Sequence, residues 1–177
     1  PKGPSWVAML RDLIDEEIGA SLPQAAREMF RVMLGMLDEL DQRIAELDKE
    51  IARRAREDEV ARRLMTIPGI GPIVATAIAA LAPAAETFRR GRDFAAWLGL
   101  TPLQKSTGGK TKLGRTSKMG ERTLRRLLII GSSSVVRQAS RRGAPEGSWL
   151  AGMLARKPRM LVTVAQANKT ARIIWAL

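Results

Sequence analysis

The sequence predicts a mainly α-helical protein: a long coiled-coil helical arm, then a compact helical domain with a helix-hairpin-helix-like turn and one small β-hairpin. Three observations lead to this fold class. Apolar residues in the first third of the chain alternate three and four positions apart, Gly and Pro divide the rest into short helical segments, and one Gly-rich stretch separates two short alternating segments. With 177 residues, 45% of them hydrophobic, the chain is long enough to bury a sizeable core.

The first 63 residues are predicted to form the helical arm. Residues 5–20 favour a short amphipathic helix, and residues 24–63 favour one long helix because they contain no Pro and a single Gly. The apolar residues with the three-four spacing are Phe30, Met33, Leu37, Leu40, Ile44, Leu47 and Ile51. This heptad spacing predicts a coiled coil through which residues 24–63 form a homo-oligomer, either a dimer or a tetramer. The alternative is a long helix packed on its own domain.

Residues 64–177 are predicted to form the compact domain. The sequence Pro-Gly-Ile-Gly-Pro at residues 68–72 ends one helix and opens the next, because Gly permits a tight turn and Pro suits the first helical position. Helices are predicted over residues 73–81, 92–98, 121–140, 148–156 and 160–177. Residues 101–120 are polar and rich in Thr and Gly, and the Gly108-Gly109 pair predicts a β-hairpin there.

Charge is distributed unevenly between these two regions. Residues 1–63 contain 11 basic and 14 acidic side chains, whereas residues 64–177 contain 19 basic and only 4 acidic ones. The net charge of the whole chain is +12, so the second region carries the entire positive excess. Such an excess predicts that the second region binds a polyanion, and nucleic acid is the polyanion that we expect.

Two features of the second region are candidate phosphate contacts. The turn with Gly69 and Gly71 resembles the hairpin of a helix-hairpin-helix element, in which backbone amides hold a phosphate; the alternative is a plain turn between core helices. The second feature is a run of eight basic residues opposed only by Glu121: Lys105, Lys110, Lys112, Arg115, Lys118, Arg122, Arg125 and Arg126. A solvated basic face is the alternative for this run, but its arginines fall on one helix face beside a Gly-rich loop, which favours phosphate contact.

The chain contains no His, no Cys and no Tyr. This composition excludes Cys/His metal sites, a Ser-His-Asp triad, a thiol nucleophile and a phosphotyrosyl intermediate made by this chain. The four acidic residues of the basic region are too far apart in sequence for a two-metal nuclease, so no metal site is expected. The remaining nucleophile is a hydroxyl, and Ser106 and Ser117 lie in the basic loop next to Lys105 and Lys118. The alternative for either serine is a turn or capping hydroxyl.

Several motifs of the second region occur together in one known family. They are Ile-Pro-Gly-Ile-Gly-Pro at residues 67–72, Gly-Arg-Asp-Phe-Ala-Ala-Trp-Leu-Gly-Leu-Thr-Pro at 91–102, Ser-Thr-Gly-Gly-Lys at 106–110, Ser-Lys-Met-Gly at 117–120 and Ala-Asn-Lys-Thr-Ala-Arg at 167–172. In this order they resemble the C-terminal half of the insertion-sequence transposases that include the pilin-gene-inverting recombinases, a family of RNA-guided serine recombinases. The resemblance covers about residues 64–177.

The resemblance implies a C-terminal transposase domain whose serine forms a transient covalent link to DNA during recombination. By its place in the Ser-Thr-Gly-Gly-Lys motif, Ser106 is the implied nucleophile, and Ser117 is the reserve candidate. The family also implies a guide (bridge) RNA and an acidic, nuclease-like N-terminal domain that binds Mg²⁺. Residues 1–63 do not supply that domain, so we expect no cofactor in this chain, a longer intact protein, and no recombination by this chain alone.

Two other functions stay open at this point. One is a non-catalytic nucleic-acid-binding module with coiled-coil oligomerisation, and the other is a structural adaptor in which the coiled coil is the important part. The sequence has no apolar run of about 18 residues that would predict a membrane span. We therefore expect no membrane partner and a location in the bacterial cytoplasm, in association with the nucleoid.

Overall fold

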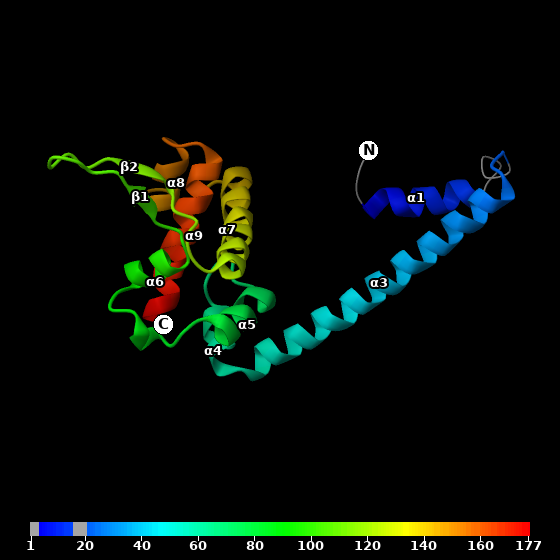
Figure 1. Cartoon of the computed structure of the whole chain (residues 1–177), viewed down its shortest axis with the longest axis horizontal. Helices are drawn as coiled ribbons and strands as arrows, with labels where there is room; N and C mark the ends of the chain where they lie inside the picture. Colours follow the sequence, from blue (N-terminus) through cyan, green and yellow to red (C-terminus); the bar gives the residue numbers. More distant parts are fainter. Residues whose placement is uncertain (1–3, 16–20) are drawn as a thin grey trace. The chain divides into compact units, whose positions relative to one another are not determined.

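A computed structural model of the chain describes residues 4–15 and 21–177 (Figure 1). The chain divides into two compact units, Pro1–Glu50 and Ile51–Leu177. The elements are α1 (Pro4–Asp15), α3 (Gln24–Glu57), α4 (Glu59–Leu64), α5 (Pro72–Leu81), the 3₁₀ turn η1 (Ala85–Thr87), α6 (Gly91–Trp97), β1 (Pro102–Gln104), β2 (Leu113–Thr116), α7 (Arg122–Arg142), α8 (Trp149–Leu154) and α9 (Arg159–Ala176). The predicted fold class, mainly α with one small hairpin, is confirmed. The predicted functional division at residue 63 stays a prediction, because a compact unit does not by itself define a function.

The first unit consists of α1 and most of α3. Arg11 of α1 donates from Nη2 to both carboxylate oxygens of Asp38 on α3, at 2.7 and 2.8 Å. This ion pair is exposed, and exposed pairs contribute little, so the burial of Ile14 and Leu34 contributes more to holding the two helices together.

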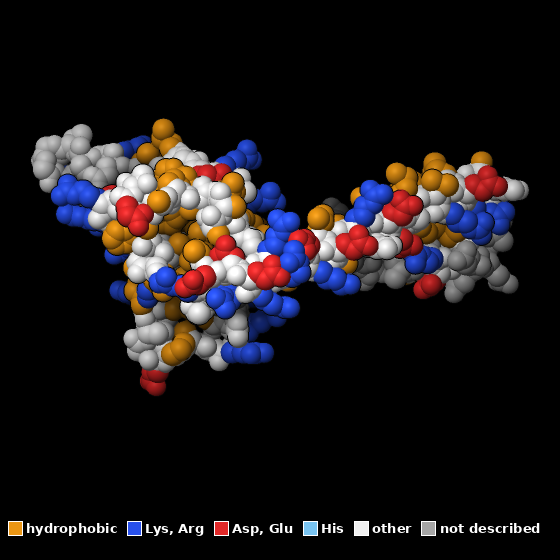
Figure 2. Space-filling model, turned by 90° about the horizontal axis from the view of Figure 1, so that it is seen from below, with side chains coloured by type: hydrophobic (Ala, Val, Ile, Leu, Met, Phe, Trp, Pro, Cys, Tyr) orange, Lys and Arg blue, Asp and Glu red, His pale blue; other side chains and the backbone are white. Residues whose placement is uncertain are grey.

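The apolar seam of α3 is exposed to solvent. Leu37, Leu40, Ile44 and Leu47 are between 41% and 62% exposed. Figure 2 shows hydrophobic side chains along one side of this helix, with charged side chains beside them. Within the described part of their own unit these four side chains are therefore exposed, and their heptad spacing would suit a partner helix.

The predicted single helix over residues 24–63 is wrong at its C-terminal end, because the chain leaves the helical conformation at Asp58. This residue is extended (φ −79°, ψ 123°), and its carboxylate Oδ1 accepts a hydrogen bond from the amide of Ala61 at 2.7 Å. An aspartate in this position is a favourable N-cap, and Glu59 in the first turn of α4 complements the helix dipole. The cap therefore ends α3 at Glu57 and starts α4.

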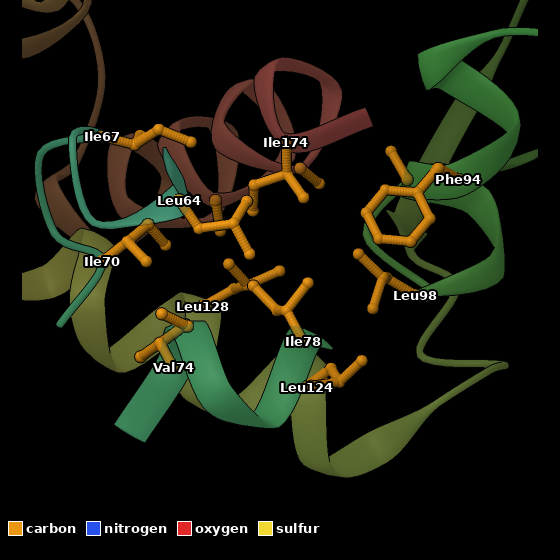
Figure 3. Close-up of a cluster of buried hydrophobic side chains, with 14 of the residues drawn as sticks. Leu64, Ile67, Ile70, Val74, Ile78, Phe94, Leu98, Leu124, Leu128 and Ile174 are labelled. Carbon is orange, nitrogen blue, oxygen red and sulfur yellow. The ribbon is translucent and has the colours of Figure 1, made fainter. Parts of the chain in front are cut away.

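The core of the second unit is formed by side chains from α4, α5, α6, α7 and α9 (Figure 3). It is built from aliphatic residues and one phenylalanine: Leu64, Ile67, Ile70, Val74, Ile78, Phe94, Leu98, Leu124, Leu128 and Ile174. Phe94 also contacts Phe88 edge-on and stacks on Trp97, with ring centroids 5.2 and 5.7 Å apart. These aromatic contacts hold the end of α6, from which the chain enters the hairpin.

The Gly-rich turn between α4 and α5 packs tightly against α7. Gly69 has a positive φ of +89°, and a Cβ atom there would lie 2.8 Å from the carbonyl oxygen of Gly131. A Cβ atom on Gly131 would in turn lie 2.1 Å from the carbonyl oxygen of Gly69. The two glycines therefore allow a backbone-to-backbone contact that no other residue pair would permit.

The predicted hairpin is confirmed. β1 and β2 pair antiparallel, with Pro102 opposite Thr116 and Gln104 opposite Leu113. The ribbon of the two strands projects from the helices of its unit (Figure 1). Among the described residues, no helix combines the length and apolarity that crossing a membrane requires.

Candidate nucleic-acid interface

The tip of the hairpin is a two-residue glycine turn. Gly108 and Gly109 both have positive φ, +54° and +77°, and the amide of Lys110 donates to the carbonyl oxygen of Thr107 at 3.1 Å. Positive φ at both central residues defines a type I′ turn, whose twist matches that of the flanking strands. The glycine pair thus fixes which side chains stand next to the turn: Ser106 and Thr107 before it, Lys110 and Lys112 after it.

Ser106 replaces a backbone partner in the hairpin. The amide of Lys105 donates to the carbonyl oxygen of Lys112 at 2.8 Å, as in a regular ladder. The amide of Lys112 donates instead to the hydroxyl oxygen of Ser106, at 3.3 Å. This bond ties the exposed side chain of Ser106 to the backbone of Lys112.

Ser117 lies at the base of the hairpin, away from the glycine turn. Its amide donates to the carbonyl oxygen of Thr101 at 2.8 Å, and the next amide, of Lys118, donates to Gly99 at 3.1 Å. Ser117 is partly buried, whereas Ser106 is exposed. The structure therefore separates the two candidate nucleophiles: Ser106 stands among the lysines near the tip, and Ser117 belongs to a segment fastened to the end of α6.

Most of the predicted phosphate-binding side chains are exposed and lie on the hairpin or just after it. Those on the hairpin are Lys105, Lys110, Lys112 and Arg115; Lys118 follows it, and Arg122 and Arg126 lie on the first turns of α7. Cations at a helix N-terminus oppose the helix dipole at roughly 0.3–1 kcal/mol each. Arg122, in the first turn of α7, therefore does not stabilise this helix through its dipole, which favours a role in binding an anion.

Arg125 differs from the other basic residues of the run. It is partly buried, and its Nη1 donates to the carbonyl oxygen of Leu98 at 3.1 Å. The guanidinium group thereby ties the start of α7 to the end of α6. Arg125 consequently has a structural contact that spacing along the sequence did not indicate.

Glu121, the acidic residue of the run, caps α7. Its carboxylate accepts a hydrogen bond from the amide of Leu124. Burial by itself raises the pKa of Glu121, but hydrogen bonds from the amides of Leu124 and Thr123 and from the Thr123 hydroxyl, with the charge of Arg125, outweigh burial and lower the pKa. A capping carboxylate with a lowered pKa is a poor proton acceptor, so Glu121 is a structural residue.

Replacing Glu121 with Gln should reduce the free energy of unfolding by about 1 kcal/mol or less at neutral pH, because the charged cap is lost. Since the folded-state pKa is lowered, the carboxylate stabilises the fold fully above the unfolded-state value of 4.5 and loses this effect as the pH falls through the folded-state pKa. Urea titrations of both proteins between pH 8 and pH 3 should therefore show a difference that is constant above about pH 5.5 and shrinks below pH 4.5. A difference that grows toward low pH would contradict the capping role.

The glycine turn stands apart from the hairpin along α7. Gly69 touches α7 at Gly131, nine residues beyond Arg122, which corresponds to roughly 13 Å along a helix. Gly69 thus permits a close contact with the backbone of α7. At Gly71 no atom lies within 4 Å of where a Cβ would be. Phosphate binding at Gly69 and Gly71 stays a prediction.

Sequence reasoning missed a set of basic side chains outside the run at residues 105–126. Arg90, Arg92, Lys169 and Arg172 line a groove together with Arg115 of the hairpin. Lys169 and Arg172 belong to the Ala-Asn-Lys-Thr-Ala-Arg motif at residues 167–172, and this motif is the sequence feature that could have indicated them. The structure thus brings a C-terminal motif next to the hairpin.

No cluster of three or more acidic residues that could hold a metal ion occurs in the part of the chain that the structure describes. The expectation that this chain holds no cofactor stays a prediction.

Comparison with known proteins gives a consistent set of similarities. Residues 61–145 match the model of the family described as Transposase IS116/IS110/IS902. The chain is 48% identical over 158 residues to a Pseudomonas aeruginosa protein named "Probable family 20 transposase". It is 38% identical over 138 residues to the transposase for insertion sequence element IS1328 of Yersinia enterocolitica, and 35% identical over 152 residues to that for IS1111A of Coxiella burnetii.

The similarity extends over most of this chain but over less than half of each relative. The aligned parts make up 89%, 78% and 84% of the chain in these three comparisons, and 47%, 41% and 42% of the respective relatives. The chain therefore corresponds to a part of proteins about twice its length.

Proposed function

We propose that this chain is the C-terminal part of a DNA transposase that uses a serine nucleophile, because residues 61–145 match the model of the family described as Transposase IS116/IS110/IS902. The observation that carries the proposal is the position of Ser106. Its hydroxyl is exposed on a hairpin whose charged side chains are all cationic, namely Lys105, Lys110, Lys112 and Arg115. A hydroxyl in such surroundings is suited to attack a phosphodiester.

In the proposed step, the oxygen of Ser106 bonds to a DNA phosphorus while one ester bond from that phosphorus to a deoxyribose oxygen breaks. The serine proton passes to an acceptor and the leaving oxygen takes up a proton, so charge and atoms balance. Lysines beside the hydroxyl stabilise the negative charge that develops on the phosphate oxygens. With no His in the chain and Glu121 occupied as a cap, the proton acceptor comes from outside the hairpin.

The rest of the intact protein belongs to the same proposal. The acidic half that binds Mg²⁺ would come from the domain that the resemblance implies, and a guide RNA would select the DNA. The exposed apolar seam of α3 would associate with a second copy as a coiled coil, placing two or more serines in one assembly. Pairing of serines would let strands be exchanged without free broken ends.

Replacing Ser106 with Ala in the intact transposase should abolish covalent protein–DNA adducts, a loss of at least about 10³-fold, because the attacking oxygen is removed. Adducts formed with radiolabelled DNA of the element's ends and quenched in detergent measure this loss. Binding of the same DNA should be nearly unchanged, since the cationic side chains remain.

The matched control is Ser117→Ala, which removes a hydroxyl at the base of the same hairpin and should leave adduct formation within a few fold of the unaltered protein. Adducts that persist in the Ser106 variant and vanish in the Ser117 variant would transfer the role to Ser117. If the unaltered protein binds DNA but forms no adduct, the second function is favoured: a non-catalytic binding module in which Ser106 only completes the hairpin through its bond from Lys112.

A further inference from the structure

A second basic surface lies beside the hairpin, in a groove with a volume of about 1640 Å³. Its walls are β2, the start of α6, the start of α8 and one side of α9. The start of α6 and helix α9 approach each other closely at this groove. A Cβ atom on Gly91 would lie 3.1 Å from the carbonyl oxygen of Arg172 and 3.2 Å from the Cα atom of Arg172. This contact fixes the start of α6 against α9 and thereby defines the shape of the groove.

The charged side chains of the groove are all cationic. Five basic residues line it, namely Arg90, Arg92, Arg115, Lys169 and Arg172, and no Asp or Glu is among its described lining residues. All five are exposed. Five like charges around one concavity repel one another unless an anion neutralises them, so the groove is electrostatically complementary to a polyanion.

Exposed apolar side chains also line the groove, and we refer to them as its floor and to the basic residues as its rim. Trp149 is 40% exposed and Met160 is 66% exposed, and Leu113, Leu161 and Ile173 accompany them. The ammonium group of Lys169 lies 4.8 Å from the centre of the Trp149 ring, which holds the indole in place at the groove. Exposed apolar groups gathered in a concavity are typical of a binding surface.

We propose that this groove binds a single-stranded segment of nucleic acid, with phosphates on the basic rim and unpaired bases on the apolar floor. A duplex presents its phosphates but keeps its bases paired inside, so it would leave the floor uncovered. An unpaired base has an open face that stacks on aromatic and apolar side chains. Rim and floor together therefore select a single strand over a duplex.

The groove is a site separate from the Ser106 hairpin, although Arg115 belongs to both. Its phosphate and base contacts do not involve the serine hydroxyl, so the proposal does not depend on the covalent step. It also gives a role to the Ala-Asn-Lys-Thr-Ala-Arg motif. Asn168 donates from Nδ2 to the carbonyl oxygen of Leu100 at 3.2 Å and anchors α9 to the chain before β1, while Lys169 and Arg172 face the groove.

The test measures fluorescence anisotropy of a labelled oligothymidylate of about 20 nucleotides, and of a duplex of the same length, with the full chain. Replacing both Arg92 and Arg172 with Ala should weaken oligothymidylate binding about 25-fold at 0.1 M salt, because each phosphate contact on a single strand contributes about 0.7 to the slope of log K against log salt. Met160→Glu should weaken it at least fivefold by placing an anion on the floor, and Trp149→Ala by a similar factor through lost stacking.

Matched controls lie on α7 and outside the groove. The double variant Arg137→Ala/Arg141→Ala removes two exposed arginines, and Ile130→Glu adds an anion at an exposed apolar position. Both controls should bind oligothymidylate within about twofold of the unaltered chain. Since all the replaced side chains are exposed, circular dichroism should show an unchanged helix content in every variant.

The outcomes separate this proposal from the function of the hairpin. Weaker oligothymidylate binding by the groove variants, with duplex binding nearly kept, supports the groove. Equal losses for single strand and duplex, or no loss at all, overturn it. A Lys110→Ala/Lys112→Ala variant tests the hairpin in the same assay. If only this variant loses affinity for oligothymidylate, the hairpin proposal is retained and the groove proposal is wrong. An oligouridylate should bind within about threefold of oligothymidylate, because phosphates and base faces are common to RNA and DNA.

Discussion

Replacing Gly131 with Ala should destabilise the second unit by about 3 kcal/mol or more, although Ala is the better helix former. In an unconstrained helix this change would stabilise by about 1 kcal/mol. Here the new methyl group would lie 2.1 Å from the carbonyl oxygen of Gly69, far inside van der Waals contact. The obstacle is backbone, which cannot rotate away as a side chain would, so α7 and the glycine turn would have to separate.

Thermal unfolding followed by circular dichroism measures this effect, and a loss of that size should lower the midpoint by roughly 10 °C. The control is Gly35→Ala in the middle of α3, where no atom lies within 4 Å of the would-be Cβ. That variant should unfold at the same temperature as the unaltered chain or a few degrees higher. A Gly131 variant as stable as the Gly35 variant would show that α7 does not contact the turn as described.

We expect the chain to be an oligomer, and we expect replacement of Leu40 and Ile44 with Asp to convert it to a monomer. Both side chains are exposed in α3, so the fold of the single chain does not depend on them. In a coiled coil each would be buried against a partner helix, and losing two such side chains removes roughly 3–6 kcal/mol of association free energy. Burying the new carboxylates would add a further cost. Sedimentation velocity at several concentrations measures the change.

The matched control is Gln42→Asp/Ala45→Asp, which adds two negative charges to α3 at positions off the apolar seam. It should sediment like the unaltered chain, because those positions face away from a partner in the heptad arrangement. Helix content by circular dichroism should be the same in both variants. A Leu40/Ile44 variant that remains oligomeric would mean that the seam of α3 is not the surface of association.

Local patterns were sufficient for most of the elements. Pro72 opens α5, and the Gly108-Gly109 pair forms the hairpin turn, because both effects depend on the dihedral angles of one or two residues. The prediction failed at Asp58, where a side chain that satisfies a free amide of the next turn ends α3 six residues early. An Asp within a charged helix resembles any solvated residue in the sequence, so the cap was not recognised.

The candidate site was only partly accessible from sequence. The run of basic residues was visible as composition, but Arg125 turned out to bind the carbonyl oxygen of Leu98. The groove was not predicted, since Arg92 and Arg172 are 80 positions apart and meet only because Gly91 allows α6 to approach α9. Contacts of this kind depend on packing between helices, which no local pattern encodes.

The sequence by itself determined the fold class, the place and turn of the hairpin, and the charge that points to nucleic acid. Each of these depends on residue type and spacing within a short stretch of chain. Only the tertiary structure decided that Gly69 packs on Gly131, that Ser106 and Ser117 stand at different parts of the hairpin, and that two distant basic segments form one groove. These depend on which helices pack together, and that choice is made by the whole core at once.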